Sequence, residues 1–156
     1  MRIKHLTEKM QFSTSATWKK DKEGSLLTTD YPKPIPFSCP PELGGIETPS
    51  PEVLFLSAIA TCTLTTLLHI CDSLRTTPNT LEVSVSGDLR LNEAINYEFE
   101  NIKCRLEVTG DEFLLERACE KVPQLCVVSN SIKPLISYQI IINSQHRLTL
   151  TNQKSS

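Results

Sequence analysis

The sequence predicts an α+β fold, and three observations support this prediction. Short stretches of alternating apolar and polar residues, typical of half-buried strands, occur on both sides of the chain's centre. Between them lies one long apolar segment, residues 53–75, whose composition is typical of a helix buried on most sides. A second helical stripe follows before the last strands. Antiparallel sheets that pack against a central helix are the natural way to cover such a segment.

Length and charge limit the classes of function. A chain of 156 residues fits one domain, so residues 1–156 are expected to form a single domain. The net charge is −2, and no run of Lys or Arg exceeds two residues, so no nucleic-acid partner is predicted. The N-terminal stretch carries scattered charges and no apolar leader, so a cytoplasmic location is expected. Structural disulfides are rare there, and the six cysteines are expected to be free thiols.

The first fifty residues predict strands and then a loop. Alternating stretches around Ile3, Thr17–Lys19 and Ser25–Thr28 favour a strand meander. Residues 31–51 contain seven of the ten prolines. Because proline lacks the N–H donor, this stretch is predicted to be an extended loop without regular helix or central strand.

The long helix has clear start and stop signals. Ser50 is a good N-cap, Pro51 suits the first helical position, and Glu52 places a negative charge where the helix dipole favours it. The helix should end near Arg75, before the breaker stretch Thr76–Asn79.

The apolar part of this helix is long enough to cross a bilayer. Val53–Cys71 contains 19 residues with no formal charge except a possible one on His69. However, five hydroxyl side chains interrupt it, both flanks resemble amphipathic strands of soluble proteins, and no basic cluster sets an orientation. We therefore expect a core helix and no membrane partner. The five are Ser57, Thr61, Thr63, Thr65 and Thr66.

The second half of the chain predicts three more strands. Residues 80–91 and 97–109 alternate apolar and polar positions and are expected to form an antiparallel pair with one buried face. Leu135–Asn143, which contains three consecutive isoleucines, is the strongest strand signal in the chain. The tail 151–156 is polar.

Two helical segments lie between these strands. Gly110-Asp111 is expected to cap a helix whose inward stripe ends at Val122, and Pro123 interrupts it. A short helical piece is predicted at 125–132, and it should stop at Lys133-Pro134.

The cysteines divide into packing residues and candidates for chemistry. Cys71, Cys104 and Cys119 lie on predicted inward faces, where free cysteine behaves as a small hydrophobe. Cys39 lies in the proline-rich loop, where it is expected to be exposed, with no evident role.

Cys62 and Cys126 have different surroundings. Cys62 has small or polar neighbours in Ala60-Thr61-Cys62-Thr63, which let another segment or a ligand approach the helix. Cys126 follows Pro123 at the start of a short helix, where the helix dipole lowers a thiol's pKa. From the residues alone, a functional pair and simple packing both remain open.

Other chemistries lack the required patterns. No CxxC pair is present, and His69 with Cys71 is too sparse for a zinc site. Neither a glycine-rich phosphate loop nor a serine nucleophile elbow is visible. No metal or cofactor is therefore expected.

Three motifs resemble a known family. PPELGG at 40–45, SPEVLFLSAIATC at 50–62 and LCVVSNSI at 125–132 occur in the order and spacing typical of the osmotically inducible protein C and organic hydroperoxide resistance family (OsmC/Ohr). In that family a Pro-Glu dipeptide opens a long helix bearing the first cysteine, and a second cysteine follows about sixty residues later. The strand and helix order agrees over nearly the whole chain.

The resemblance implies both a fold and an activity. It implies an intertwined homodimer, with antiparallel sheets wrapped around long central helices, and a thiol-dependent peroxidase that reduces organic hydroperoxides without a cofactor. Cys62 would attack the peroxide and become a sulfenic acid, which Cys126 would resolve as a disulfide. An external dithiol would then restore both thiols.

Glu52 is the third candidate site residue. Ten residues of helix span about 15 Å, so Glu52 and Cys62 of one chain cannot touch. If both serve one site, that site must form between two chains. The alternative is that Glu52 only stabilises the helix dipole.

Two departures from the family pattern matter. Val127 stands where a proline usually follows the second cysteine, and the loop 31–51 lacks the arginine of peroxidatic members. A cysteine in mid-helix needs a nearby cation to become a thiolate. The candidates are Lys19, Lys20, Lys22 and Lys33.

Two alternatives to the peroxidase therefore stay open. One is a non-enzymatic dimer that binds an apolar or reactive small molecule. The other is a protein in which the cysteines serve packing only.

Overall fold

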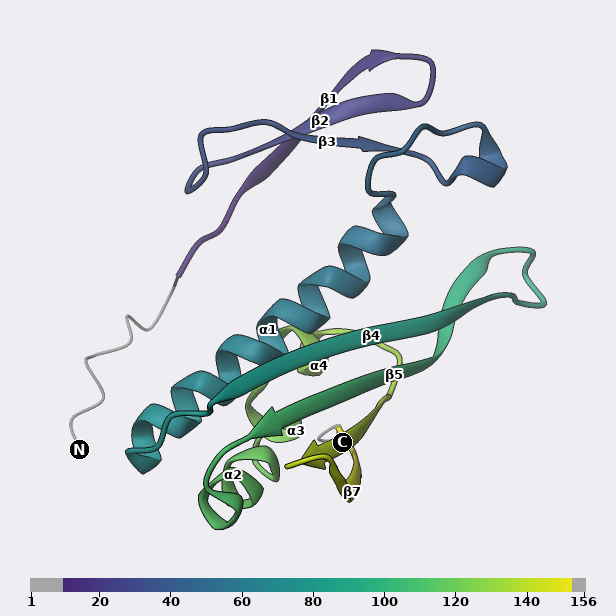
Figure 1. The fold of residues 1–156 in the computed structure, drawn as a ribbon. Coiled ribbons are helices and arrows are strands. Elements are labelled where there is room, and N and C mark those ends of the chain that lie inside the picture. Colours follow the sequence, from purple (N-terminus) through teal and green to yellow (C-terminus); the bar gives the residue numbers. More distant parts are fainter. Residues whose placement is uncertain (1–9, 153–156) are drawn as a thin grey trace. The chain divides into compact units, whose positions relative to one another are not determined.

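A computed structural model describes residues 10–152 and confirms the α+β fold, with two sheets and one long helix (Figure 1). The chain divides into two compact units, one up to Leu54 and the other from Phe55 onward. Each unit is described below by itself. The expectation of a single domain over residues 1–156 stays a prediction.

The first unit contains a three-stranded antiparallel sheet in the order β1-β2-β3. Its strands are β1 (Thr14–Lys20), β2 (Glu23–Thr28) and β3 (Ile35–Ser38), and a 3₁₀ turn, η1 (Pro41–Leu43), follows. The meander prediction is confirmed for β1 and β2, whereas Ile3 lies outside the described residues.

The proline-rich stretch is more regular than expected, because β3 and η1 both lie within it. Pro36 occupies the middle of β3, opposite Ser25. This is compatible with proline because β3 is an edge strand, where the missing N–H interrupts no second ladder. The predicted exclusion of a central strand therefore holds, while the prediction of an unbroken loop was wrong.

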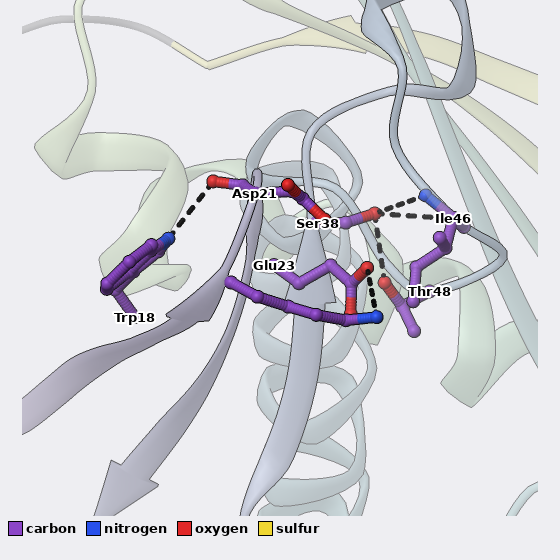
Figure 2. Close-up of polar contacts among 7 residues, drawn as sticks. Trp18, Asp21, Glu23, Ser38, Ile46 and Thr48 are labelled. Atoms are coloured by element: carbon purple, nitrogen blue, oxygen red, sulfur yellow. Dashed lines mark hydrogen bonds and ion pairs between the residues drawn. The ribbon is translucent and has the colours of Figure 1, made fainter.

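Side-chain hydrogen bonds fold the segment after β3 back on itself (Figure 2). The Ser38 hydroxyl donates to the Ile46 carbonyl at 3.0 Å and accepts from the Ile46 N–H at 3.1 Å. The Thr48 hydroxyl lies 3.1 Å from Ser38 Oγ. The buried Ser38 side chain thus makes hydrogen bonds to this loop that a neighbouring strand would otherwise make.

The central helix, α1 (Pro51–Leu74), begins and ends where the sequence predicts. The Ser50 hydroxyl accepts from the Val53 N–H at 3.4 Å, as an N-cap does. Arg75, just past the last helical residue, has a φ of 56°, the left-handed conformation that commonly ends a helix.

The second unit contains a four-stranded sheet in the order β4-β5-β6-β7. The strands are β4 (Thr80–Leu91), β5 (Tyr97–Thr109), β6 (Ile136–Ile142) and β7 (Gln145–Thr151). Neighbours are antiparallel except β5 and β6, which run parallel. A parallel pair needs a long crossover, and the helical segments between β5 and β6 provide it.

Three short helices form this crossover: α2 (Glu112–Cys119), α3 (Val122–Leu125) and α4 (Val127–Ser131). The predicted cap of α2 is confirmed, because Asp111 Oδ1 accepts from the Leu114 N–H at 2.9 Å. Pro123 lies in the first turn of α3, where its missing N–H costs no hydrogen bond. The predicted helix at 125–132 is therefore divided at Cys126.

The core of the second unit lies between α1 and the sheet. Ile59, Leu67 and Ile70 of α1 cluster with buried residues of β5 and β6. Within a single chain, the expectation that α1 is buried on most sides was wrong. Its fully buried residues share a single face, and they are Ile59, Thr63, Leu67, Ile70 and Cys71.

Among the described residues, α1 is the single helix that is long and apolar enough to cross a membrane. Its most apolar 18-residue window has a mean hydropathy of 1.9, yet only 22% of that window is buried. The core helix of a water-soluble protein meets the same criteria. Within residues 10–152, most of this apolar window is thus left uncovered.

Candidate functional site

The structure brings the two predicted cysteines together within the second unit. Cys62 lies in the middle of α1 and is half-buried, whereas Cys126 lies between α3 and α4 and is fully buried. Although 64 residues separate them in sequence, each thiol affects the other's pKa. The chain therefore contains an adjacent pair of reduced thiols.

Backbone and side-chain hydrogen bonds fix the position of Cys126. The Asn130 amide donates to the carbonyls of Pro123, Gln124 and Cys126 at 3.1, 3.0 and 2.9 Å. The Ser129 hydroxyl donates to the Cys126 carbonyl at 3.1 Å. These bonds connect α3 and α4 at the residue that carries the thiol.

A buried hydroxyl lies behind the pair. The Oγ1 atom of Thr63 lies 3.8 Å from Cys126 Sγ and 4.0 Å from Cys104 Sγ. Thr63 and Ser129 are fully buried, and so is Tyr138. Among residues 10–152 the Tyr138 hydroxyl has no hydrogen-bond partner. These three buried side chains are polar but carry no charge. They make the inner side of the site polar and enclosed.

The surroundings of Cys126 favour its thiolate. Burial alone would raise the pKa of Cys126. The Ser129 hydroxyl and backbone N–H outweigh this effect, with further contributions from Cys62 and Thr63, so that the pKa lies below its ordinary value. This agrees in direction with the sequence-based expectation for a thiol at the start of a helix.

The surroundings of Cys62 have the opposite effect. Burial is the largest cause and raises the pKa of Cys62, the Val128 N–H opposes it, and Cys126 raises it further. The predicted lysine cations all lie in the first unit. Two of them are engaged there, since Lys22 Nζ donates to the Leu43 carbonyl at 2.6 Å and Lys20 pairs with Glu23 at 3.8 Å. A cation beside Cys62 stays a prediction.

Three of the remaining cysteines are packing residues, as predicted. Cys71, Cys104 and Cys119 are buried in the apolar core. Burial raises the pKa of Cys104 to about 12 and that of Cys119 to about 12, so both stay protonated at neutral pH. Cys39 is half-buried and its thiol donates to the Leu43 carbonyl at 3.4 Å.

Glu52 lies in the first turn of α1, in the first unit. Its Oε2 atom is buried and has no hydrogen-bond partner among the residues that the structure describes. A shared site with Cys62 stays a prediction, because the two residues lie in different units.

Sequence reasoning missed three residues of the site. The sequence shows Thr63 only as a neighbour of Cys62 and as one of five hydroxyl residues in the apolar helix, and it does not indicate a role for Ser129 or Asn130. The sequence did contain a signal for Ser129. This residue lies three positions after Cys126, which starts a helix, and a hydroxyl at that spacing is well placed to hydrogen-bond back to the starting residue. The position of Thr63 depends on tertiary packing, which no local pattern indicates.

Two further features bear on ligands. Within residues 10–152, no three His, Cys, Asp or Glu side chains gather in a way that holds a metal ion. A cavity of about 320 Å³ in the second unit is lined by Phe55, Phe99, Pro134, Glu98 and Lys133. The rings of Phe55 and Phe99 stack with centroids 4.9 Å apart.

Comparison with known proteins gives a family and a fold. Residues 44–140 match the family model described as OsmC-like protein. An OsmC-like protein of unknown function from Vibrio cholerae superposes with a TM-score of 0.74 at 18% identity, covering 85% of this chain and 100% of that one. No curated protein sequence matches this chain significantly.

Two other solved structures are named organic hydroperoxide resistance proteins. The one from Elizabethkingia anophelis has a TM-score of 0.69 at 17% identity, covering 88% of this chain and 98% of that one. The one from Legionella pneumophila has a TM-score of 0.68 at 19% identity, covering 85% and 96%. At these identities the likeness shows the fold.

Proposed function

We propose that this chain, which belongs to the OsmC-like protein family, is a thiol-dependent peroxidase that reduces organic hydroperoxides through Cys62 and Cys126. The observation that carries the proposal is the adjacency of these two thiols, 64 residues apart in sequence, within the second unit. Two proteins with the same fold are named for organic hydroperoxide resistance, which supports this reaction class.

The different exposure of the two thiols supports a different role for each. Cys62 is partly accessible and can meet a peroxide, whereas Cys126 is fully buried and cannot. Cys62 therefore attacks the peroxide and becomes a sulfenic acid. Cys126 then attacks the Cys62 sulfur and forms the disulfide, which an external dithiol reduces.

The cavity beside α1 favours an apolar substrate. Phe55 precedes Cys62 by seven residues, which is two helical turns or about 10 Å along the same face of α1. Its stacked partner Phe99 and Pro134 complete an apolar lining, and Lys133 pairs with Glu98 at 3.4 Å at the same cavity. An alkyl hydroperoxide gains from such contacts, whereas hydrogen peroxide has no apolar part to bury.

A homodimer completes the proposal. The apolar surface that one chain leaves exposed on α1 suits a second copy. In that dimer, Glu52 of one chain contributes to the site that holds Cys62 of the other, and its unpartnered Oε2 is available for that contact. The proposed location is the cytoplasm, where dithiol reductants maintain the thiols.

Turnover with a defined peroxide tests the function. With cumene hydroperoxide and excess dithiothreitol, the wild-type protein should consume peroxide catalytically. Cys62→Ser should abolish this, Cys126→Ser should reduce it at least tenfold, and Cys39→Ser, as the matched control, should leave it unchanged. Consumption that Cys62→Ser does not lower would rule out the proposal.

One observation favours a second candidate, a dimer that binds an apolar or reactive molecule without turnover. The raised pKa of Cys62 disfavours the attacking thiolate. This candidate predicts that Cys62→Ser still binds an apolar probe such as cumyl alcohol, while the wild-type protein consumes no peroxide.

A further inference from the structure

The hydroxyl of Thr63 is oriented differently from those of its neighbours on α1. Thr61 and Thr65 donate to helix carbonyls four residues earlier, at 2.9 Å to Ser57 O and 2.9 Å to Thr61 O. This is the usual arrangement for threonine within a helix. Thr63 is fully buried, and its hydroxyl instead lies between the thiols of Cys126 and Cys104.

The direction of these two hydrogen bonds follows from counting protons. A threonine hydroxyl has one proton to donate. Cys104 lies in the core and keeps its own proton at neutral pH, so its thiol is the donor to Thr63 Oγ1. The Thr63 proton is then free to point at Cys126 Sγ, 3.8 Å away.

Cys126 thus receives donors from several sides while it is shielded from solvent. Thr63 approaches from α1 and the Ser129 N–H from α4, whereas the single Ser129 hydroxyl proton is donated to the Cys126 carbonyl. Cys62 provides a further thiol. A sulfur that is surrounded by donors is stabilised as the anion, because hydrogen bonds to the charged form favour it.

We propose that Thr63 holds the negative charge of the reduced thiol pair on Cys126, and that Cys126 is the proton acceptor that activates Cys62. The inference rests on the proposed peroxidase function and adds to it a role for Cys126 before the disulfide forms. Thr63 is a positioning residue in this account, because it acts through Cys126.

Every proton and bonding electron pair in the proposed reaction is accounted for. The Cys62 S–H proton moves to the Cys126 thiolate, and the Cys62 thiolate attacks the terminal oxygen of ROOH. The O–O bond breaks, a Cys62 S–O bond forms, and Cys126 returns its proton to the departing alkoxide to give ROH. Cys126, again a thiolate, attacks the Cys62 sulfur. The hydroxide that leaves takes a proton from solvent and becomes water.

This arrangement makes a loop arginine unnecessary. An arginine would stabilise the Cys62 thiolate by its charge. The Cys126 thiolate achieves a similar result by accepting the proton, and the hydroxyl and N–H donors around it replace the cation.

A site-specific titration tests where the charge lies. In reduced protein labelled with 13C at cysteine Cβ, the Cys126 signal should titrate at lower pH than the Cys62 signal. Cys62→Ser should keep the low titration of Cys126. Thr63→Val should raise the Cys126 titration midpoint by about one pH unit. Thr65→Val, the matched control on the same helix, should not move it.

Two results would overturn the proposal. One is a Cys62 signal that titrates before Cys126. The other is a Thr63→Val midpoint equal to that of Thr65→Val in a protein that remains folded. Because the titration uses no peroxide, it is independent of turnover. A protein with the expected order that consumes no peroxide refutes the proposed function and leaves the location of the charge supported.

Discussion

At the scale of the residue, burial of thiols determines how the protein responds to alkaline pH. The pKa of Cys119 is raised from an ordinary value of 9.0 to about 12 by burial, so the folded state holds this proton more tightly than the unfolded state does. The stabilisation is complete below about pH 9 and is lost as the pH rises toward about 12. Under reducing conditions, the free energy of unfolding should therefore decline across this window.

Cys119→Ala should make that decline shallower. The variant loses a buried sulfur, so it should be less stable than wild type by about 1 kcal/mol at pH 7. Denaturant melts at pH 7, 9 and 10.5 measure both effects. Cys39→Ala, in the loop of the first unit, should keep the wild-type pH dependence. An equal decline in Cys119→Ala and wild type would contradict the assigned pKa.

The sequence identified the two thiols that the structure places together, but not the groups that surround them. Cys62 and Cys126 stand out by their neighbours and by the motif order, and the structure brings them together. Thr63 lies one residue from Cys62 and resembles four other hydroxyl residues in the same helix. Its distinct contact depends on β5 placing Cys104 opposite it, which is a tertiary effect.

At the scale of the element, we expect the junction of α3 and α4 to control how readily the proposed disulfide forms. The Asn130 amide joins three carbonyls around this junction. Asn130→Ala removes these bonds, at a net cost on the order of 1–2 kcal/mol. Stopped-flow measurement of disulfide formation after one equivalent of cumene hydroperoxide should show a rate lowered about tenfold.

Ser131→Ala provides the matched control on the same helix. Its hydroxyl donates to the Val127 carbonyl at 2.8 Å and, in the described part of the chain, makes no hydrogen bond with Cys126. This variant should form the disulfide at the wild-type rate. If Asn130→Ala and Ser131→Ala behave alike, the junction does not position the thiol.

Secondary structure was predictable where local signals agree with packing. The strands at 80–91 and 97–109 and the ends of α1 match the predictions, because alternation and capping act locally. The parallel pairing of β5 and β6 was not predicted, since strand order depends on how the crossover folds. The edge strand around Pro36 was also missed, because its position at the edge depends on its neighbours.

At the scale of the whole molecule, the proposed dimer accounts for the exposed apolar surface of α1. A dimer of two 17.5 kDa chains has a mass of about 35 kDa, which light scattering measures directly. Leu68 is 37% exposed on α1, and Leu68→Asp should shift the protein toward monomer. Leu135→Asp, at a residue 55% exposed outside the helices, should remain dimeric.

A monomeric wild-type protein would contradict the dimer. Partition of the purified wild-type chain into lipid vesicles would contradict it in another way, because the helix would then be covered by lipid. Either result would also remove the proposed contribution of Glu52 across the interface.

The most direct test of the central claim is the identity of the bond that an organic hydroperoxide creates. Reduced protein is treated with one equivalent of cumene hydroperoxide, the remaining thiols are alkylated, and the peptides are mapped by mass spectrometry without reduction. The account predicts a Cys62–Cys126 disulfide within one chain, with the other four cysteines alkylated. Six alkylated cysteines, or a disulfide that omits either Cys62 or Cys126, would contradict it.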